Sequence, residues 1–177
     1  MITIRELIKN IAPGQSSMQI RLILRGLDSF HESIKNKIIV SYVRKELEGT
    51  TVFFKIPSET KSMSYDVCVW MDADSKPNIN TAIKVYSNSP NFAYNFAYLF
   101  NTDGSLLFSN YYPASFLSIP PKTRNPLNVK AFDKHVYAAV KELFKFNIPE
   151  QLRKFSGLME PRIQTFNQKI RERDTTS

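Results

Sequence analysis

The chain contains a single cysteine, only five glycines among 177 residues, and no long hydrophobic run. One cysteine excludes an intrachain disulfide, so Cys68 fits a reducing compartment. The scarcity of glycine argues against a Gly-rich repeat protein. No apolar run approaches the ~18 residues that a membrane-spanning helix needs, and the first residues lack the pattern of a signal peptide. We therefore expect a protein made in the cytoplasm, with no membrane span.

Histidine is equally scarce, with His31 and His135 the only two in the chain. A serine or cysteine nucleophile needs a base, usually histidine, and neither of these histidines lies in a recognisable nucleophile motif. His135 falls on a predicted helix, where a histidine without a chemical role is the more common outcome. Cys68 falls inside a predicted strand, where a buried, unreactive thiol is usual.

Carboxylates that could hold a metal ion gather only between positions 66 and 74 of the predicted sheet. A calcium loop starting at Asp72 needs glycine at its sixth position, where Pro77 stands. A magnesium-dependent nuclease centre at Asp66 lacks its second carboxylate, because Ala82 occupies that position. Phosphate-binding Gly loops and zinc-ligand spacings are also missing from the chain. We predict no catalytic residue, no metal and no cofactor, and an unrecognised enzyme using Asp66 or His135 is the third alternative.

The net charge of +8 is unevenly distributed along the chain. Residues 120–177 hold twelve lysines and arginines against six acids, a balance of +6, and the first 119 residues hold twelve against ten. An excess of positive charge attracts nucleic acid, anionic surfaces or acidic protein partners over long distances. It is equally consistent with a solubilising surface.

Hydrophobic periodicity predicts helices near the amino terminus. Residues 3–11 have an apolar residue at every third or fourth position, with Thr3 as a cap and Glu6 three residues later. Residues 18–34 also follow helical spacing, although Gly26 weakens the helix by about 1 kcal/mol relative to alanine.

After Lys37 the period of the hydrophobic pattern changes to two residues, which predicts strands. Alternating runs at 38–43 and 52–56 flank Glu48-Gly49 and are typical of a hairpin. Residues 65–71 and 82–87 predict two more strands, and 105–108 a short additional one. Their close spacing favours an antiparallel meander.

The strongest alternation lies at 92–100, where FAYNFAYLF places an aromatic ring at every second residue. Strict alternation is typical of a strand, because successive side chains point to opposite faces of a sheet. Exposed rings on a sheet can stack nucleic-acid bases. Large apolar patches are rare on soluble monomers, however, and the carboxy-terminal helices have apolar stripes that could cover these rings. We expect the ring face to be buried under those helices.

Prolines divide the carboxy-terminal third into a loop followed by helices. Residues 109–126 predict a Pro-rich loop, and Asn125-Pro126 predicts a helix start. A helix through 132–144, a short one through 152–155 ended by Gly157, and a last one opened by Pro161 follow. We predict one α+β domain over 1–177: a helical segment at 1–36, an antiparallel sheet of about five strands at 37–108, the Pro-rich loop at 109–126 and helices at 127–174.

Several short motifs resemble those of proteins from tailed bacteriophages. They are Ser87-Asn88-Ser89-Pro90 with the FAYNFAYLF that follows, Arg124-Asn125-Pro126 and Phe132-Asp133-Lys134. The chain resembles small virion or virion-associated proteins over residues 37–145, and its richness in Lys, Asn, Ile, Phe and Tyr is similar to that of AT-rich phages. The resemblance implies a virion component, at the head, neck or tail connection. It carries no catalytic residue over.

Taken together, these observations predict a phage structural or assembly protein that contacts other virion proteins, in several copies. The Pro-rich loop and the basic carboxy-terminal helix are the expected contact surfaces; neither is expected to depend on the core, and a neighbouring protein can order both. The candidate contact residues are Tyr111, Tyr112, Arg124, Arg162, Lys169, Arg171 and Arg173. The alternative function is nucleic-acid binding by the basic carboxy-terminal segment.

Overall fold

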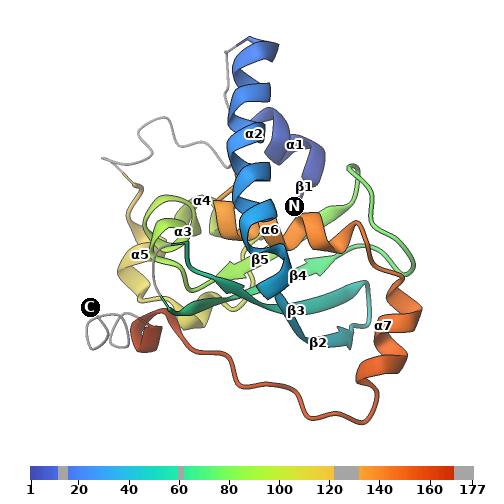
Figure 1. Ribbon diagram of the computed structural model, residues 1–177. Coiled ribbons are helices and arrows are strands. Elements are labelled where there is room, and N and C mark those ends of the chain that lie inside the picture. The colour runs from blue at the N-terminus through green and yellow to red at the C-terminus, as the bar shows by residue number, and fades with distance from the viewer. Residues whose placement is uncertain (12–15, 60–61, 122–131, 170–177) are drawn as a thin grey trace.

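Five strands form one antiparallel sheet in the computed structural model, which describes residues 1–11, 16–59, 62–121 and 132–169 (Figure 1). The strand order is β1-β5-β4-β3-β2, so β2 to β5 make the predicted meander and β1 is added beside β5. The predicted α+β class is confirmed. The strands are β1 (Ile2–Thr3), β2 (Ile39–Lys45), β3 (Thr50–Pro57), β4 (Ser64–Met71) and β5 (Ala82–Ser87).

Helices and 3-10 turns connect and cover these strands. The amino-terminal ones are α1 (Ile4–Lys9), α2 (Ser17–Ile34) and η1 (Lys35–Lys37). After β5 come α3 (Pro90–Asn95), α4 (Ala97–Thr102), η2 (Ser109–Tyr111), α5 (Ala114–Ser118), α6 (Lys134–Leu143) and α7 (Ile148–Phe155). No helix in these described ranges is both long and apolar enough to cross a membrane.

Local signals account for the amino-terminal helices. The Thr3 hydroxyl accepts a hydrogen bond from the Glu6 backbone N–H, and the Glu6 carboxylate accepts one from the Thr3 N–H at 2.7 Å. This reciprocal pair is the predicted capping box, and it satisfies two N–H groups that a helix start otherwise leaves unpaired. The Ser16 hydroxyl caps α2 by accepting from the Gln19 N–H.

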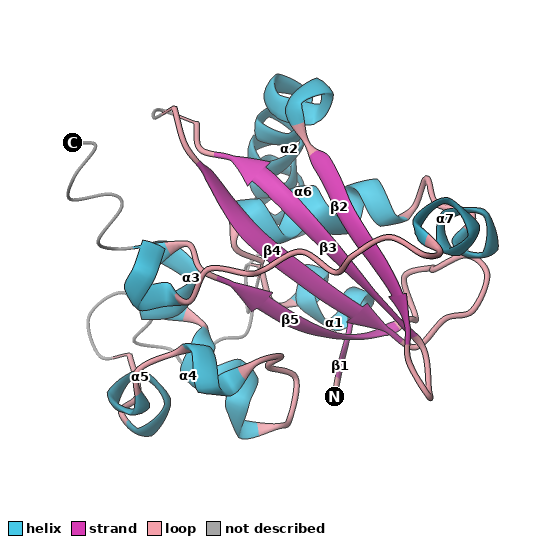
Figure 2. Cartoon of the chain, turned by 90° about the horizontal axis from the view of Figure 1, so that it is seen from below, coloured by secondary structure: helices cyan, strands magenta, loops and turns pink. Residues whose placement is uncertain are grey.

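The two faces of the sheet are covered differently. Helix α6 packs over one face and α2 packs against α6 (Figure 1). On this face Phe54 of β3 meets Phe146 and Tyr65 of β4 meets His135. In the view from below, the second face is crossed by an extended segment that leaves α7 and runs over β2, β3 and β4 (Figure 2). Phe53, Cys68 and Tyr86 are register partners on neighbouring strands, so their side chains share this second face, whereas the residues before and after each of them point to the other face.

The predicted strand at 92–100 is wrong, because these residues form α3 and α4. The Ser89 hydroxyl accepts a hydrogen bond from the Phe92 N–H, and Pro90 occupies the first helical turn, where its missing N–H is harmless. An alternating pattern also contains the spacing i, i+4, i+8, which a helix can use equally well. The ring of Phe92 accordingly contacts those of Phe96 and Phe100, at centroid distances of 6.3 and 5.3 Å. The expectation that the carboxy-terminal helices bury the whole row of rings is also wrong: Tyr94 is exposed and Phe96 and Tyr98 are half-buried. Phe92 and Phe100 are buried, and Phe92 packs against Phe96, Phe100 and Tyr112.

Other expectations also need correction. Residues 105–108 form no strand, only an isolated parallel bridge between Leu106 and Val85. Pro161 opens no helix: the chain is extended there, and a helical turn begins only at Phe166. The helix start predicted at Asn125-Pro126 lies outside the described residues, and α6 begins at Lys134 with Asp133 as its cap.

Glycine substitutions test the description of α2 and of the β2–β3 turn. A Cβ added at Gly26, in the middle of α2, meets no atom within 4 Å. We expect Gly26→Ala to raise the free energy of unfolding by about 0.5–1 kcal/mol, because alanine loses less backbone entropy in a helix. Chemical denaturation followed by circular dichroism measures the change.

The matched control is Gly49→Ala in the turn. Its φ is +79°, and an added Cβ would lie 2.3 Å from the carbonyl oxygen of Met71. We expect a loss of more than about 1 kcal/mol for this variant. A loss of stability at Gly26 as well would contradict the described environment of α2.

Candidate functional site

Residues 157–165, here called the strap, are the extended segment that crosses the second face of the sheet (Figure 2). Its backbone is held near one end, where the Gln164 N–H donates to the Asp66 carboxylate at 3.0 Å. The Gln164 carbonyl oxygen accepts from the Tyr86 hydroxyl at 2.7 Å and from the Asn88 side-chain amide at 3.2 Å. Nearer α7, the Glu160 carboxylate forms an ion pair with Arg44.

Phe166, directly after the strap, anchors it in the protein. The ring is buried and lies 5.8 Å from Tyr94, 6.3 Å from Tyr112 and 5.0 Å from Phe116, measured between centroids. The expectation that the carboxy-terminal segment does not depend on the core is therefore wrong. Burying one ring yields about 1.5–3 kcal/mol, and the partners of Phe166 lie in distant segments of the chain, which no local pattern specifies.

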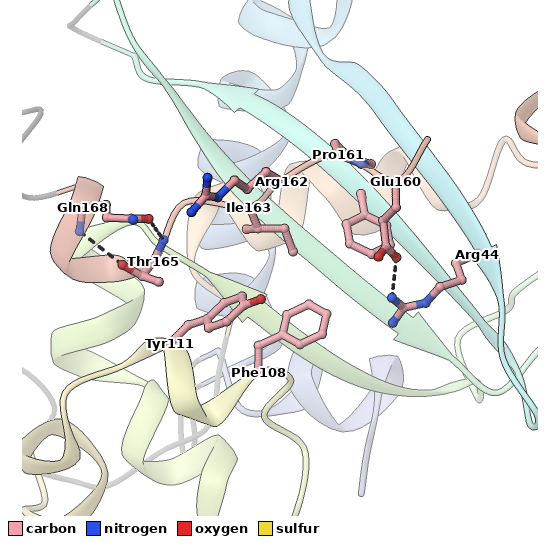
Figure 3. Close-up of a pocket in the computed structure, with 10 residues that line it drawn as sticks. Arg44, Phe108, Tyr111, Glu160, Pro161, Arg162, Ile163, Thr165 and Gln168 are labelled. Carbon is pink, nitrogen blue, oxygen red and sulfur yellow. Dashed lines mark hydrogen bonds and ion pairs between the residues drawn. The ribbon is translucent and has the colours of Figure 1, made fainter. Parts of the chain in front are cut away.

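A groove opens between the strap and the 3-10 turn η2, with a cavity volume of about 420 Å³ (Figure 3). This strap groove is in the size range of small-ligand and side-chain sites. Its first wall comes from the sheet and η2: Arg44, Phe53, Phe108 and Tyr111. Its second wall comes from the strap and the following turn: Glu160, Pro161, Arg162, Ile163, Thr165 and Gln168.

The backbone of Phe108 is strained where it enters the groove. With φ of 52° and ψ of 47° it is left-handed, and it is the only non-glycine residue with positive φ in the described ranges. An L-residue of this size rarely adopts that conformation, which costs about 1–2 kcal/mol. The strained turn places the Phe108 ring between Phe53 and Tyr111, 6.4 and 5.4 Å away between centroids.

The two arginines of the groove have different environments. Arg44 lies over the Phe53 ring and donates to Glu46 and Glu160. Partial burial acts to lower the pKa of Arg44, but the hydrogen bonds that its guanidinium donates to the two carboxylates outweigh this effect, so the pKa is raised. Arg162 is exposed, and it forms no ion pair with any residue that the structure describes.

Two of the seven predicted contact residues, Tyr111 and Arg162, both line the groove, although they are 51 positions apart in the chain. Tyr112 is not a surface residue: it is buried, its hydroxyl donates to the Ser87 carbonyl at 2.6 Å, and burial raises its pKa. Lys169 is also buried, with its Nζ 5.7 Å from the centroid of the Tyr65 ring. The remaining three, Arg124, Arg171 and Arg173, lie outside the described residues.

Sequence reasoning missed Arg44, Phe53 and Phe108 as groove residues. Arg44 and Phe53 sit on strands with unremarkable alternation, and Phe108 sits in a predicted strand. Their shared role depends on the strap crossing the sheet, which is a long-range contact without a local pattern.

The residues considered for catalysis all contact other side chains of the protein or are buried. His31 pairs with Glu142 at 2.7 Å inside the helical layer, and His135 packs edge-on against Phe30 and Tyr65.

Asp66 pairs with Lys55 at 2.9 Å in addition to holding the strap. Cys68 is buried beneath the strap, and burial, reinforced by the Asp66 charge, raises the pKa of its thiol. Within the described ranges, no three His, Cys, Asp or Glu side chains converge as a metal site would require.

No protein-family model, curated protein or solved structure matches the chain.

Proposed function

We propose that the protein is a phage structural or assembly component that works through protein–protein contacts, and that the strap groove is one contact surface. The assignment to a virion, in several copies and at the head, neck or tail connection, rests on the motif resemblance over residues 37–145. The observation that carries the contact function is the meeting of Tyr111 and Arg162 in one groove.

The composition of the groove supports this proposal. Aromatic residues and arginine are enriched at the centres of protein interfaces, where they contribute most of the binding free energy. Phe108, Tyr111 and Arg44 combine these residue types on one wall (Figure 3). Backbone strain such as that of Phe108 is concentrated at functional sites, including those that hold ligands.

A second exposed surface is consistent with a contact protein. The amino-terminal half of α2 stands away from the sheet, while its carboxy-terminal half packs against α6 (Figure 1). Met18 and Leu22, one helical turn apart, are 71% and 56% exposed. Neighbouring apolar side chains exposed on one helix face often mark a contact region.

Nucleic-acid binding is the second candidate, since the groove offers aromatic rings beside arginines. A site that tracks phosphates needs several cations free to neutralise them. Here Arg44 is paired with Glu46 and Glu160, and Lys55 of the same sheet face is paired with Asp66. Arg162 alone among the groove cations has no carboxylate partner in the described residues. This balance of charge favours a protein partner.

Photo-crosslinking from the groove tests the proposal. We expect a benzoylphenylalanine introduced in place of Tyr111 to crosslink to a virion protein in cells infected by the encoding phage. The matched control places the same group at Tyr98, which is half-buried on α4 and does not line the groove. Mass spectrometry of the crosslinked product identifies the partner peptide.

The outcomes separate the two functions. A virion peptide crosslinked at Tyr111 and not at Tyr98 supports the contact function. A nucleic-acid adduct at Tyr111 instead establishes the second candidate, and equal yields from both positions overturn the groove as a specific contact.

A further inference from the structure

We infer that the strap groove binds a carboxylate side chain of an extended acidic segment, in which a large apolar residue neighbours the acid. This inference rests on the proposed contact function and names the chemistry of the partner. It follows from three properties of the groove: its surplus of hydrogen-bond donors, its apolar walls and a carboxylate that it already holds.

Donors in the groove outnumber acceptors. Arg162 contributes a guanidinium that no described carboxylate neutralises. Gln168 uses its side-chain oxygen to accept from the Thr165 N–H at 2.9 Å, which leaves its NH₂ group to donate. The Tyr111 hydroxyl extends into the groove (Figure 3) and forms no hydrogen bond with a described residue. A ligand that satisfies these groups must accept hydrogen bonds, and an anion accepts the strongest ones.

The walls between these donors are apolar. Phe108 and Tyr111 line one side, and Pro161 and Ile163 of the strap line the other (Figure 3). An isolated inorganic anion would leave these surfaces uncovered, whereas an aromatic or aliphatic side chain next to the acid covers them. Burying that side chain adds about 25 cal/mol for each Å² of apolar surface removed from water.

The groove already holds one carboxylate from the protein itself. Glu160, carried on the extended strap, pairs with Arg44 at one end of the groove. That pair is an intramolecular example of the proposed recognition: a glutamate on an extended chain, bound by a guanidinium that lies over a phenylalanine ring. Arg162 offers the same group without such a partner, and this complementarity favours an acidic peptide as the occupant.

Titration of the full chain with small probes tests the inference. The first probe is the acetylated and amidated tripeptide Asp-Phe-Glu, and the second is its uncharged isostere Asn-Phe-Gln. Nuclear magnetic resonance of the arginine side chains follows binding. We expect the acidic peptide to bind with a dissociation constant of about 1 mM, and the isostere to bind at least about tenfold more weakly.

Variants assign the binding to the groove. Arg162→Gln is expected to weaken the acidic peptide at least about fivefold, and Tyr111→Phe about threefold, because each removes donors while leaving the fold intact. The control Arg153→Gln removes an exposed arginine of α7 that does not line the groove, and it should leave the affinity unchanged.

The remaining outcomes overturn the inference. Equal affinity for the two tripeptides, or an Arg153→Gln effect as large as that of Arg162→Gln, removes the specific carboxylate site. Inorganic phosphate that competes at the same concentration as the acidic peptide shows a general anion site instead. If the acidic peptide fails to bind while Tyr111 still crosslinks to a virion protein, the partner chemistry is wrong and the contact function stands.

Discussion

Replacing Asp66 with alanine is expected to increase the rate at which a thiol reagent labels Cys68 by about 10- to 100-fold. Cys68 is the only cysteine, it is 1% exposed, and Pro161 and Ile163 of the strap lie over it. Asp66 holds the strap through the Gln164 N–H. A hydrogen bond to a charged group contributes about 1.5–3 kcal/mol, and 1.4 kcal/mol corresponds to a factor of ten in the population of opened molecules.

The labelling must be followed at several pH values, because Asp66 also contributes to the raised pKa of Cys68. The comparison uses the rate at which the thiol is fully ionised, so that the change reports strap opening alone. Lys55→Met is the matched control: it removes the ion pair with Asp66 and leaves the bond to Gln164. We expect at most a few-fold change there, since a partly exposed ion pair contributes about 0–1 kcal/mol. Equal rates in wild type and Asp66→Ala would show that the strap does not protect Cys68.

Asp133→Ala is expected to lower the free energy of unfolding by about 3 kcal/mol at neutral pH. The Asp133 carboxylate is 1% exposed and accepts from the backbone N–H groups of His135 and Val136 at 2.9 and 3.3 Å. It also accepts from the Asn91 side chain at 2.6 Å, which connects α6 to α3. Loss of a helix cap costs about 0.5–2 kcal/mol, and an unpaired buried donor adds about 1–3 kcal/mol. Chemical denaturation followed by circular dichroism measures the change.

The same residue predicts a pH dependence. Burial acts to raise the pKa of Asp133, but the neighbouring His135 side chain, 3.3 Å away, and the hydrogen bonds from Asn91 and Val136 lower it below its ordinary value of 3.8. A lowered pKa in the folded state stabilises the protein above the unfolded-state pKa, and this contribution is lost as the pH falls through the folded-state value. The difference between wild type and Asp133→Ala should therefore decrease as the pH falls below about 4.

Asp74→Ala provides the control for both measurements. Asp74 is an exposed carboxylate whose ion pair with Lys45 lies at the surface, so its removal should change stability by less than about 1 kcal/mol. A loss as large as that of Asp133→Ala, or a stability difference for Asp133→Ala that grows below pH 4, would contradict the assigned role of Asp133.

The structural elements that residues close together in the chain specify were predicted correctly. The capping box of Thr3 and Glu6, the turn at Gly49 and the alternation of β3, β4 and β5 each depend on residues a few positions apart. The prediction failed where one hydrophobic pattern is compatible with both the two-residue period of a strand and the 3.6-residue period of a helix. The rings at 92–100 satisfy a strand and a helix alike, and Ser89 with Pro90 favours the helix.

The candidate site was predictable only in part. Tyr111 and Arg162 could be selected as an aromatic and a basic residue in segments expected at the surface. Tyr112, adjacent to Tyr111, is buried instead, because its hydroxyl bonds to the backbone of Ser87 in β5. Sequence alone cannot distinguish two neighbouring tyrosines in a loop, since the difference lies in which one faces the sheet.

Local sequence was sufficient to predict the start of α1, the hairpin turn and the strands β2 to β5, because hydrogen bonds and side-chain periods within a few residues specify them. The path of the strap and the groove beside it could be seen only in the folded protein. The bond from Gln164 to Asp66 spans 98 residues, and Phe166 is buried by rings from three other segments. Such contacts form because they bury apolar surface and satisfy buried polar groups across the whole chain, and no local pattern encodes them.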